Sequence, residues 1–285
     1  MKSPVFAYAA PDSVTEACRL LADDEDAKLL AGGQSLVPLL ALRLAAPTTL
    51  VDLRRVPGLI GIEHDAGVLR LGAMTTHRAI ERSSLVRDVA PAIAAAASLI
   101  AHPQVRTRGT IGGAVAHADA AAEWPAVLLA LGGHVEVTGA AGGRTIPADD
   151  LFVGPFMTSL EPDELITSVL LPVDGREIWV DEHQRRHGDY GLSILAMSYR
   201  LAGGVLTDVR LAVAGATGSV TRASGAEAAL EGRTPGNGGA AAVAALAGEL
   251  SYTADIHGSA DYRRDITTTL FQRALRAAGE RSGQA

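Results

Sequence analysis

Two segments of the sequence combine paired glycines with a hydroxyl side chain, and both could bind an anion. The first glycine loop (residues 31–36) is Ala31-Gly32-Gly33-Gln34-Ser35-Leu36, and the second glycine loop (residues 108–114) is Arg108-Gly109-Thr110-Ile111-Gly112-Gly113-Ala114. Glycine tolerates positive φ angles and lets a backbone approach a ligand closely. Consecutive N–H groups in such a turn form an anion-binding concavity. With the cationic Arg106 and Arg108 nearby, the two loops fit one diphosphate held from both sides.

The residues alone leave the ligand of these loops open. A single Gly-Gly pair is usually only a turn, and the hydroxyl of Ser35 could cap the following helix instead of binding a phosphate. Neither loop contains the Gly-Lys-Ser/Thr sequence of a Walker loop, and neither matches the G-x-G-x-x-G pattern of a Rossmann dinucleotide site. The pattern therefore favours an anion site and disfavours the two common nucleotide motifs.

The first glycine loop lies between a predicted strand and a predicted helix. Residues 27–31 form a short apolar run that predicts a strand, residues 36–44 predict a helix, and residues 48–53 predict a second strand. A capping box at Ser13 and Glu16 begins an earlier helix. Strand, glycine turn, helix and strand make an α/β unit with a crossover connection.

The second glycine loop follows an alanine-rich helix expected over residues 85–101, with an early interruption at Pro91. A helix over residues 119–131 follows the loop, and hairpins flank the whole segment. Pro172-Val173-Asp174-Gly175 is the best candidate for a domain boundary. Beyond it we expect strands at residues 177–184, 193–201 and 205–214, then helices at 225–230, 238–250 and 260–278. Strands followed by helices predict a separate α+β domain.

The composition excludes several classes of protein. Hydrophobic residues make up 48% and charged residues 20% of 285 residues, which permits a sizeable core and argues against global disorder. A net charge of −7 and an aromatic content of 4% argue against nucleic-acid binding. The single cysteine, Cys18, excludes an internal disulfide and a cysteine-ligated iron–sulfur cluster. No apolar run is long enough to span a membrane and no signal peptide begins the chain, so we expect a cytoplasmic protein.

The histidines and the single cysteine do not predict a metal site. His183 and His187 are four residues apart, but no third ligand is evident near them. Cys18 lies on an amphipathic helix and is expected to be a packed thiol. We therefore predict no metal site in this chain, and we find no acid–base pair that demands a catalytic role.

Longer segments around both loops resemble the FAD-binding medium subunit of the xanthine dehydrogenase and carbon monoxide dehydrogenase family, the molybdenum hydroxylases. The resemblance extends from the first glycine loop through Val37-Pro38-Leu39-Leu40, and from Ala101-His102-Pro103 through the second loop to Ala122-Glu123-Trp124-Pro125. The resemblance continues over nearly the whole chain in Phe152-Val153-Gly154-Pro155-Phe156 with Glu164-Leu165-Ile166, in Gly188-Asp189-Tyr190 and in Ser259-Ala260-Asp261-Tyr262-Arg263-Arg264. Thr107 and Ala120 depart from the family pattern, where asparagine and proline are frequent.

The resemblance implies an α+β fold with two parts. Residues 1–174 would form an FAD-binding domain of the p-cresol methylhydroxylase type, with subdomains at about 1–54 and 55–174. Residues 175–285 would form a C-terminal domain of a three-stranded antiparallel sheet and helices.

The resemblance also implies which residues bind FAD, and no residue is assigned a catalytic role. The pyrophosphate would be bound, mainly by backbone N–H groups, by Ala31, Gly32, Gly33, Gln34, Ser35, Leu36, Thr110, Ile111, Gly112, Gly113 and Ala114. Asp119 and Glu123 would bind ribose or ribityl hydroxyls. Lys28 and Leu29 would lie toward the adenine, and Ile166 and Tyr190 near the isoalloxazine ring. For Asp119 a helix N-cap, for Glu123 a solvated helix face, and for Tyr190 ordinary core packing remain the competing roles.

The function implied by the resemblance is electron transfer within a larger complex. A molybdenum-containing large subunit would oxidise the substrate, a small subunit would carry two [2Fe-2S] clusters, and FAD in this chain would pass electrons to an outside acceptor. A dimer of such heterotrimers is the expected assembly. NAD, a quinone and oxygen all remain possible acceptors, and the substrate is not given by this chain. Two alternatives are a stand-alone FAD-dependent oxidoreductase and a flavin-free assembly module.

Overall fold

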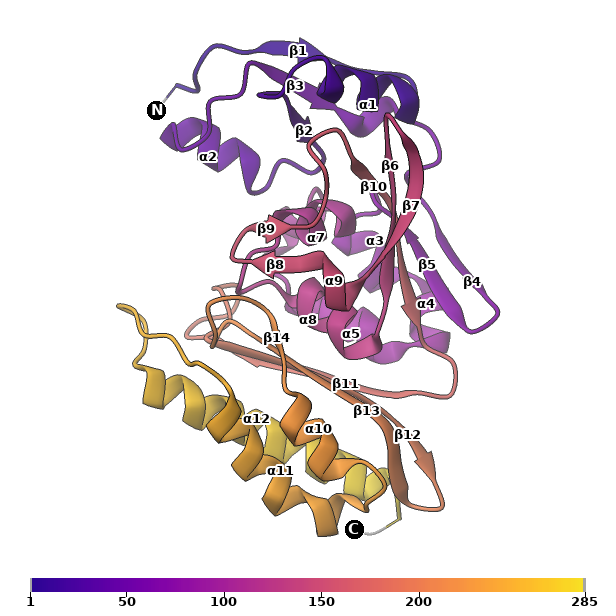
Figure 1. Cartoon of the computed structure of the whole chain (residues 1–285), viewed down its shortest axis with the longest axis vertical. Coiled ribbons are helices and arrows are strands. Elements are labelled where there is room, and N and C mark those ends of the chain that lie inside the picture. Colours follow the sequence, from indigo (N-terminus) through magenta and orange to yellow (C-terminus); the bar gives the residue numbers. More distant parts are fainter. Residues whose placement is uncertain (1, 284–285) are drawn as a thin grey trace.

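The structure, a computed structural model, describes residues 2–283 in three tiers along the long axis of the molecule (Figure 1). The first tier is a parallel three-stranded sheet in the order β1-β3-β2, flanked by two helices. Its elements are β1 Ala7–Ala9, α1 Val14–Ala22, β2 Lys28–Leu30, α2 Leu36–Leu42 and β3 Thr49–Asp52, followed by the short 3-10 helix η1 Leu53–Arg55. Ser13 caps α1, because its hydroxyl accepts from the Glu16 N–H at 3.1 Å. This tier confirms the α/β unit predicted around the first glycine loop.

The middle tier is a five-stranded antiparallel sheet, in the order β4-β5-β10-β6-β7, covered by helices. Its strands are β4 Ile62–Asp65, β5 Val68–Gly72, β6 His134–Gly139, β7 Gly142–Pro147 and β10 Leu165–Pro172, with a separate hairpin of β8 Phe152–Gly154 and β9 Met157–Thr158. Its helices are α3 His77–Arg82, α4 Ser84–Val89, α5 Pro91–Leu99, α6 Pro103–Arg106, α7 Ile111–His117, α8 Glu123–Leu131 and α9 Ala148–Leu151.

The third tier is an antiparallel sheet with helices on its outer face (Figure 1). The strands β11 Glu177–His183, β12 Ser193–Ala202, β13 Val205–Ala214 and β14 Thr221–Arg222 precede α10 Ser224–Leu230, α11 Pro235–Glu249 and α12 Ala260–Arg281. The predicted α+β class is confirmed, but the prediction of three strands was wrong by one. The fourth strand, β14, is only two residues long and is defined by its pairing with β13 rather than by a local pattern.

Two helix predictions also need correction. The helix expected over residues 119–131 begins at Glu123, and the one expected over 85–101 is two helices separated at Ala90. Pro91 begins the second of these, at the first helical position where its missing N–H costs nothing. The proline therefore starts a helix instead of interrupting one.

The C-terminal sheet shares its inner face with the core of the middle tier. Ile178, Ile194 and Ala212 of the sheet lie in the same buried cluster as the helix α8 residues Trp124 and Leu128. The outer face packs on the C-terminal helices in a second cluster that includes Phe271 and Leu246. Burial on both faces explains why most residues of β12 and β13 are apolar.

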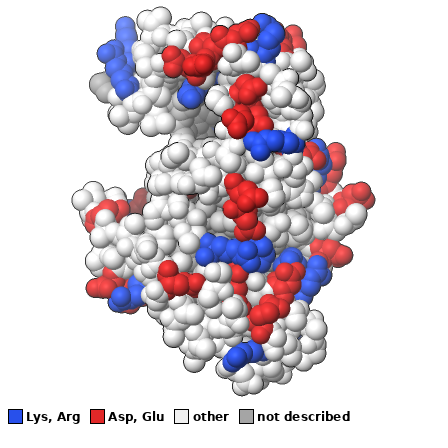
Figure 2. Space-filling model, in the orientation of Figure 1, with Lys and Arg blue, Asp and Glu red and all other residues white. Residues whose placement is uncertain are grey.

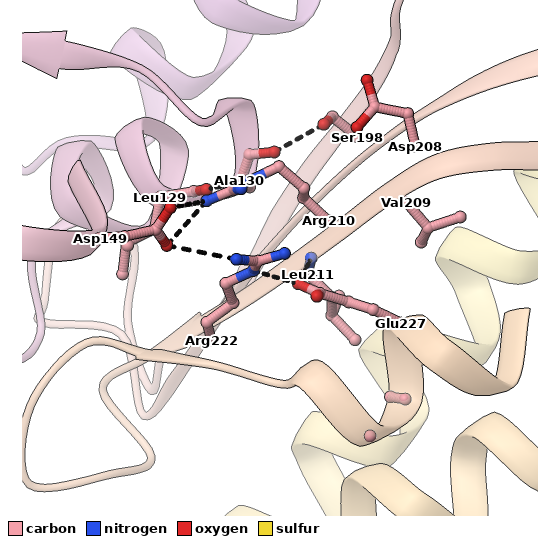
Figure 3. A network of polar contacts seen from close by, with 12 residues as sticks. Leu129, Ala130, Asp149, Ser198, Asp208, Val209, Arg210, Leu211, Arg222 and Glu227 are labelled. Carbon is pink, nitrogen blue, oxygen red and sulfur yellow. Dashed lines mark hydrogen bonds and ion pairs between the residues drawn. The ribbon is translucent and has the colours of Figure 1, made fainter. Parts of the chain in front are cut away.

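Polar contacts fix the C-terminal sheet to the end of helix α8 (Figure 3). Ser198 Oγ donates to the Ala130 carbonyl at 2.6 Å, and Arg210 Nε donates to the Leu129 carbonyl at 2.9 Å. Arg210 also forms an ion pair with Asp149 at 2.8 Å. These contacts add partners to carbonyls of the last helical turn, where Leu129 already accepts from the Gly132 N–H at 3.1 Å, and they hold the middle and C-terminal tiers in one orientation.

On the face drawn in Figure 2, acidic and basic residues are interspersed and no broad basic patch is present. Among residues 2–283, no helix is both long and apolar enough to cross a membrane. In the same part of the chain, no cluster of three His, Cys, Asp or Glu side chains could hold a metal ion.

Candidate cofactor-binding site

The two glycine loops, 75 residues apart in sequence between Gly33 and Arg108, lie directly against each other. A Cβ atom on Gly32 would be 2.3 Å from the carbonyl oxygen of Arg108 and 2.8 Å from the Cα of Gly109. A Cβ atom on Gly113 would be 3.4 Å from the Cβ of Ala31. Only glycine permits this backbone approach, so the fold brings together the two segments that the sequence singled out.

The first glycine loop presents unused hydrogen-bond donors. It connects β2 to α2, and Gly33 has a φ of 73°, a conformation that favours glycine. Within residues 2–283, the backbone N–H groups of Gly33, Gln34 and Ser35 donate to no protein acceptor. The Ser35 hydroxyl precedes α2 but makes no capping hydrogen bond. Donors left open in this way are available to an external acceptor such as a phosphate oxygen.

A cavity of about 340 Å³ opens at this loop. Two of its lining residues are arginines from other segments, Arg54 and Arg108; the others are Leu30, Ala31, Gly32, Gly33, Gln34, Val37 and Pro38. Arg54 is already paired, because its guanidinium lies 2.6 Å from the buried carboxylate of Asp52. Arg108 forms no ion pair or side-chain hydrogen bond with any residue in the described range 2–283. Its positive charge therefore remains available to an anion in the cavity.

The second glycine loop uses its donors differently. The Ile111 N–H donates to the Thr75 carbonyl at 3.0 Å, and the Gly112 N–H donates to the Ala73 carbonyl at 2.9 Å. Thr110 is the N-cap of α7, and its hydroxyl accepts from the Gly113 N–H at 3.2 Å. These bonds hold the loop against the middle tier and direct most of its N–H groups into the protein. Of this loop, Arg108 is the residue that lines the cavity.

The two arginines that the sequence placed beside the second loop have different positions. Arg106 is buried, forms an ion pair with Glu81 at 3.0 Å, and donates to the carbonyls of Ile100 and Ala101. It therefore cannot reach the cavity, and the expectation that it serves as a nearby cation for the ligand was wrong. Only Arg108 of this pair lines the site.

A buried histidine, His77, packs against the second glycine loop at Gly109. The ring of His77 would be 2.8 Å from a Cβ on Gly109, and its Nδ1 accepts from Trp124 Nε1 at 3.0 Å. Burial, with a smaller effect from Arg106, lowers the pKa of His77 to about 4. His77 is therefore neutral at physiological pH, as its acceptor role requires. No motif or spacing in the sequence distinguishes His77 from the other histidines.

Asp119, Glu123 and Tyr190 lie near one another at the junction of the middle and C-terminal tiers. Asp119 is not the N-cap of α8, because that position is Ala122; instead its carboxylate accepts from the Ala121 N–H at 2.9 Å. Burial raises the pKa of Glu123 to about 7, and Asp119 adds to the shift. Tyr190 is 70% exposed, so core packing is not its role. Its pKa is raised by partial burial of the phenol and then by Asp119 and Glu123.

The remaining predicted site residues lie on strands. Lys28 is exposed and Leu29 is half-buried on β2, the strand that leads into the first glycine loop. Ile166 is 5% exposed on β10, and its side chain belongs to the core of the middle tier. The ends of the predicted site are therefore held by different tiers, with the two glycine loops between them.

Comparisons with known proteins identify the family. Residues 4–174 match the family described as FAD binding domain in molybdopterin dehydrogenase, and residues 180–278 match the CO dehydrogenase flavoprotein C-terminal domain. The chain is 49% identical to the nicotine 6-hydroxylase medium subunit of Paenarthrobacter nicotinovorans, covering 99% of this chain and 100% of that one. It is 38% identical to the carbon monoxide dehydrogenase medium chain of Hydrogenophaga pseudoflava, covering 99% of each.

Solved structures give the same result. The structure of carbon monoxide dehydrogenase from Hydrogenophaga pseudoflava lacking the Mo-pyranopterin moiety of its cofactor superposes with a TM-score of 0.95 at 39% identity, covering 99% of both chains. Quinoline 2-oxidoreductase from Pseudomonas putida 86 superposes with a TM-score of 0.93 at 38% identity, again over 99% of both chains.

Proposed function

Because the chain belongs to the family of FAD-binding medium subunits of the molybdenum hydroxylases, we propose that it carries FAD between its two glycine loops and relays electrons to an external acceptor. The electrons would come from the iron–sulfur clusters of a small subunit. When bound, FAD supplies redox chemistry that no side chain of this chain offers. The side chains themselves bind the cofactor, orient it and set its electrostatic surroundings.

The observation that carries this proposal is the set of unused donors at the first glycine loop. Gly33 and Gln34 line a cavity and Ser35 follows them, and the same cavity is lined by Arg108, whose guanidinium has no ion-pair partner within residues 2–283. A diphosphate supplies the oxygen acceptors and the negative charge that such a group of donors lacks. The absence of a side chain at Gly32 is needed for the second loop to close the same site.

The other predicted residues fit the remaining parts of FAD. Asp119 and Glu123 present carboxyl groups that can accept hydrogen bonds from ribose or ribityl hydroxyls. Tyr190 presents an exposed aromatic ring, which suits stacking on a planar isoalloxazine. Ile166 would contribute to that end from the core below it, and Lys28 and Leu29 would lie toward the adenine. No step of the chemistry is assigned to a side chain acting as acid, base or nucleophile.

The partners follow from what this chain lacks. Its single cysteine, Cys18, is buried in the first tier, so cysteine-ligated clusters must belong to another chain. We propose a small subunit with two [2Fe-2S] clusters and a large subunit with the molybdenum cofactor, assembled as a dimer of heterotrimers. The nicotine 6-hydroxylase and carbon monoxide dehydrogenase relatives are themselves medium subunits of complexes.

The test is a visible absorption spectrum of the purified chain, followed by acid release and identification of the pigment. We expect a flavin spectrum and released FAD, either directly or after reconstitution. Purified alone, the chain should not oxidise organic substrates, whereas steady turnover without partners would favour a stand-alone oxidoreductase. A colourless protein that also fails to take up added FAD would leave a flavin-free assembly module as the function.

A further inference from the structure

A carboxyl group occupies an apolar position of strand β11. Alternate residues of a strand point to the same face, and Ile178 and Val180 pack into the core of the middle tier. Glu182 is the next residue on that face and is only 9% exposed. Asp181 points to the opposite face, where it forms an ion pair with Arg273 at 2.6 Å. The sheet therefore buries one carboxyl at the same junction that holds Glu123 and Tyr190.

Glu182 is hydrogen-bonded on one oxygen only. Its Oε1 accepts from Gln184 Nε2 at 2.6 Å, and Gln184 Oε1 in turn accepts from the Gly188 N–H at 2.6 Å. Its Oε2 is buried and has no hydrogen-bond partner among residues 2–283, and a Cβ on Gly191 would be 3.3 Å from it. The relay from Glu182 through Gln184 to Gly188 thus connects β11 to the segment that carries Tyr190, here named the Tyr190 loop (residues 184–192).

The charges that act on Glu182 are negative. Burial raises the pKa of Glu182 to about 8, with further contributions from Glu123 at the start of α8 and from Asp181. The negative charge of Asp119 in turn helps to raise the pKa values of Glu123 and Tyr190. On the other side of the Tyr190 loop the ring of His102 packs against Gly188. A carboxylate on Glu182 would therefore be buried, would have a hydrogen bond on only one of its two oxygens, and would be repelled by the negative charges of Glu123 and Asp181.

We propose that Glu182 carries a proton on Oε2 in the folded chain at neutral pH and that, through Gln184 and Gly188, it positions the Tyr190 loop at the isoalloxazine end of the site. This inference rests on the proposed function only in its last clause. Protonated, Glu182 fits an apolar junction and still accepts the hydrogen bond from Gln184. Deprotonated, it places a second negative charge beside Glu123 and loosens the junction, so Tyr190 is no longer held in place.

The direction of the pH dependence follows from the shifted pKa. The pKa of Glu182 rises from its ordinary value of 4.5 to about 8 in the folded chain, so the folded junction binds a proton that the unfolded chain releases. The junction is therefore most stable at acidic pH, weakens as the pH rises through this range, and is weakest above about 8. The Tyr190 loop should be ordered at neutral pH and should open under alkaline conditions.

The experiment is hydrogen–deuterium exchange of the full chain without FAD, measured for peptides from the Tyr190 loop on both sides of pH 8 and corrected for intrinsic exchange. Wild type should lose protection by about tenfold for each pH unit as the pH rises from about 4.5 toward 8, and the loss should level off above 8. The neutral, isosteric variant Glu182→Gln should stay protected at every pH. Asp181→Asn is the matched control, because it removes a neighbouring carboxylate on the opposite face and leaves Glu182 in place; it should keep the pH dependence, with the levelling-off moved slightly to lower pH because Asp181 contributes to the raised pKa of Glu182.

A second variant separates positioning from simple folding. Gln184→Ala cuts the relay without removing the carboxyl, so its loop should be unprotected at all pH values while the rest of the chain exchanges normally. Equal pH dependence in wild type and Glu182→Gln would overturn the inference, as would a wild-type loop whose protection does not change with pH. If the loop behaves as expected but FAD never binds, the proposed function fails and the protonated Glu182 stands.

Discussion

The two glycine loops have nearly the same residue types and opposite uses of their backbone. In the first loop, the N–H groups of Gly33, Gln34 and Ser35 have no acceptor within residues 2–283. In the second loop, the N–H groups of Ile111 and Gly112 are bonded to carbonyls of the segment that follows β5. The first loop therefore offers its N–H donors to a ligand, whereas the second loop uses its N–H donors in hydrogen bonds to the middle tier.

The difference lies in what surrounds each glycine. A Cβ on Gly33 would meet only the ends of two side chains, both at 3.2 Å. A Cβ on Gly112 would be 2.8 Å from the backbone of Ala73 and 2.5 Å from its Cβ. The first glycine is required by its positive φ, and the second by close packing of two backbones. A glycine pair alone thus indicates a backbone that can be approached closely. The residues around it determine whether a ligand or another backbone segment makes that approach.

The largest effect is expected from Gly33→Val. A β-branched residue does not tolerate a φ of 73°, so the loop must change its conformation and the open donors must move apart. We expect FAD affinity to fall by at least about 100-fold, which corresponds to about 2.7 kcal/mol. Flavin-to-protein ratio after purification and a titration with FAD measure it. Gly61→Val is the control, since no atom lies within 4 Å of its Cβ and its φ is not positive. Full flavin occupancy in Gly33→Val would remove the first loop from the site.

The second loop should respond to substitution in its stability rather than in its ligand contacts. Gly112→Ala forces a methyl group against the backbone of Ala73, and overpacking of this kind costs about 2 kcal/mol. We expect this loss in the free energy of unfolding of the flavin-free chain, measured by urea denaturation. Gly33→Ala, measured in parallel, should lose less stability and more flavin. A Gly112→Ala chain as stable as wild type but unable to bind FAD would show that the second loop contacts the ligand directly.

His77, which packs against the second loop, should make the folded chain less stable at mildly acidic pH. The pKa of His77 is lowered to about 4 by burial and by Arg106, so below 6.5 the unfolded chain binds a proton that the folded chain does not. Stability is therefore lost as pH falls from 6.5 toward 4, by roughly 1–2 kcal/mol at about pH 5. Urea denaturation at neutral pH and at this pH measures the loss. His77→Asn keeps an acceptor for Trp124 without titrating here, and its loss should be smaller; an equal loss would assign the effect to other groups.

Much of the fold was accessible from local sequence patterns. The capping box at Ser13, the apolar strands of the first tier and the order of strands before helices in the C-terminal part are short-range signals, and the structure confirms them. Strand β14 was missed because only its partner β13 defines it. Helix α8 starts later than expected because the Asp119 carboxylate binds the Ala121 N–H and favours a turn over the first helical bonds.

The sequence predicted which residue types form the candidate site, but it could not predict which backbone N–H groups remain without an acceptor. Paired glycines indicated where backbone comes close, yet which N–H groups stay open depends on Ala73 and Thr75, which lie elsewhere in the sequence. Glu182 broke the apolar alternation set by Ile178 and Val180, and that signal could have identified it. Arg106 and Arg108 looked equivalent, because a separation of two residues does not show that a helix turns one of them toward Glu81.

Arg108 therefore provides the finest test of the difference between the loops, since it is the one side chain of the second loop that lines the cavity of the first. Arg108→Ala removes a cation without a partner in the described part of the chain, so stability should change little. FAD affinity should fall by about tenfold, or about 1.4 kcal/mol, as expected for one charge-assisted contact. A titration with FAD at low and high salt measures it, and the salt dependence should be weaker in the variant. Arg55→Ala, which removes a neighbouring exposed arginine that does not line the cavity, should bind FAD like wild type. An Arg108→Ala chain with unchanged affinity would mean that the open N–H groups of the first loop suffice, and that Arg108 does not contact the ligand.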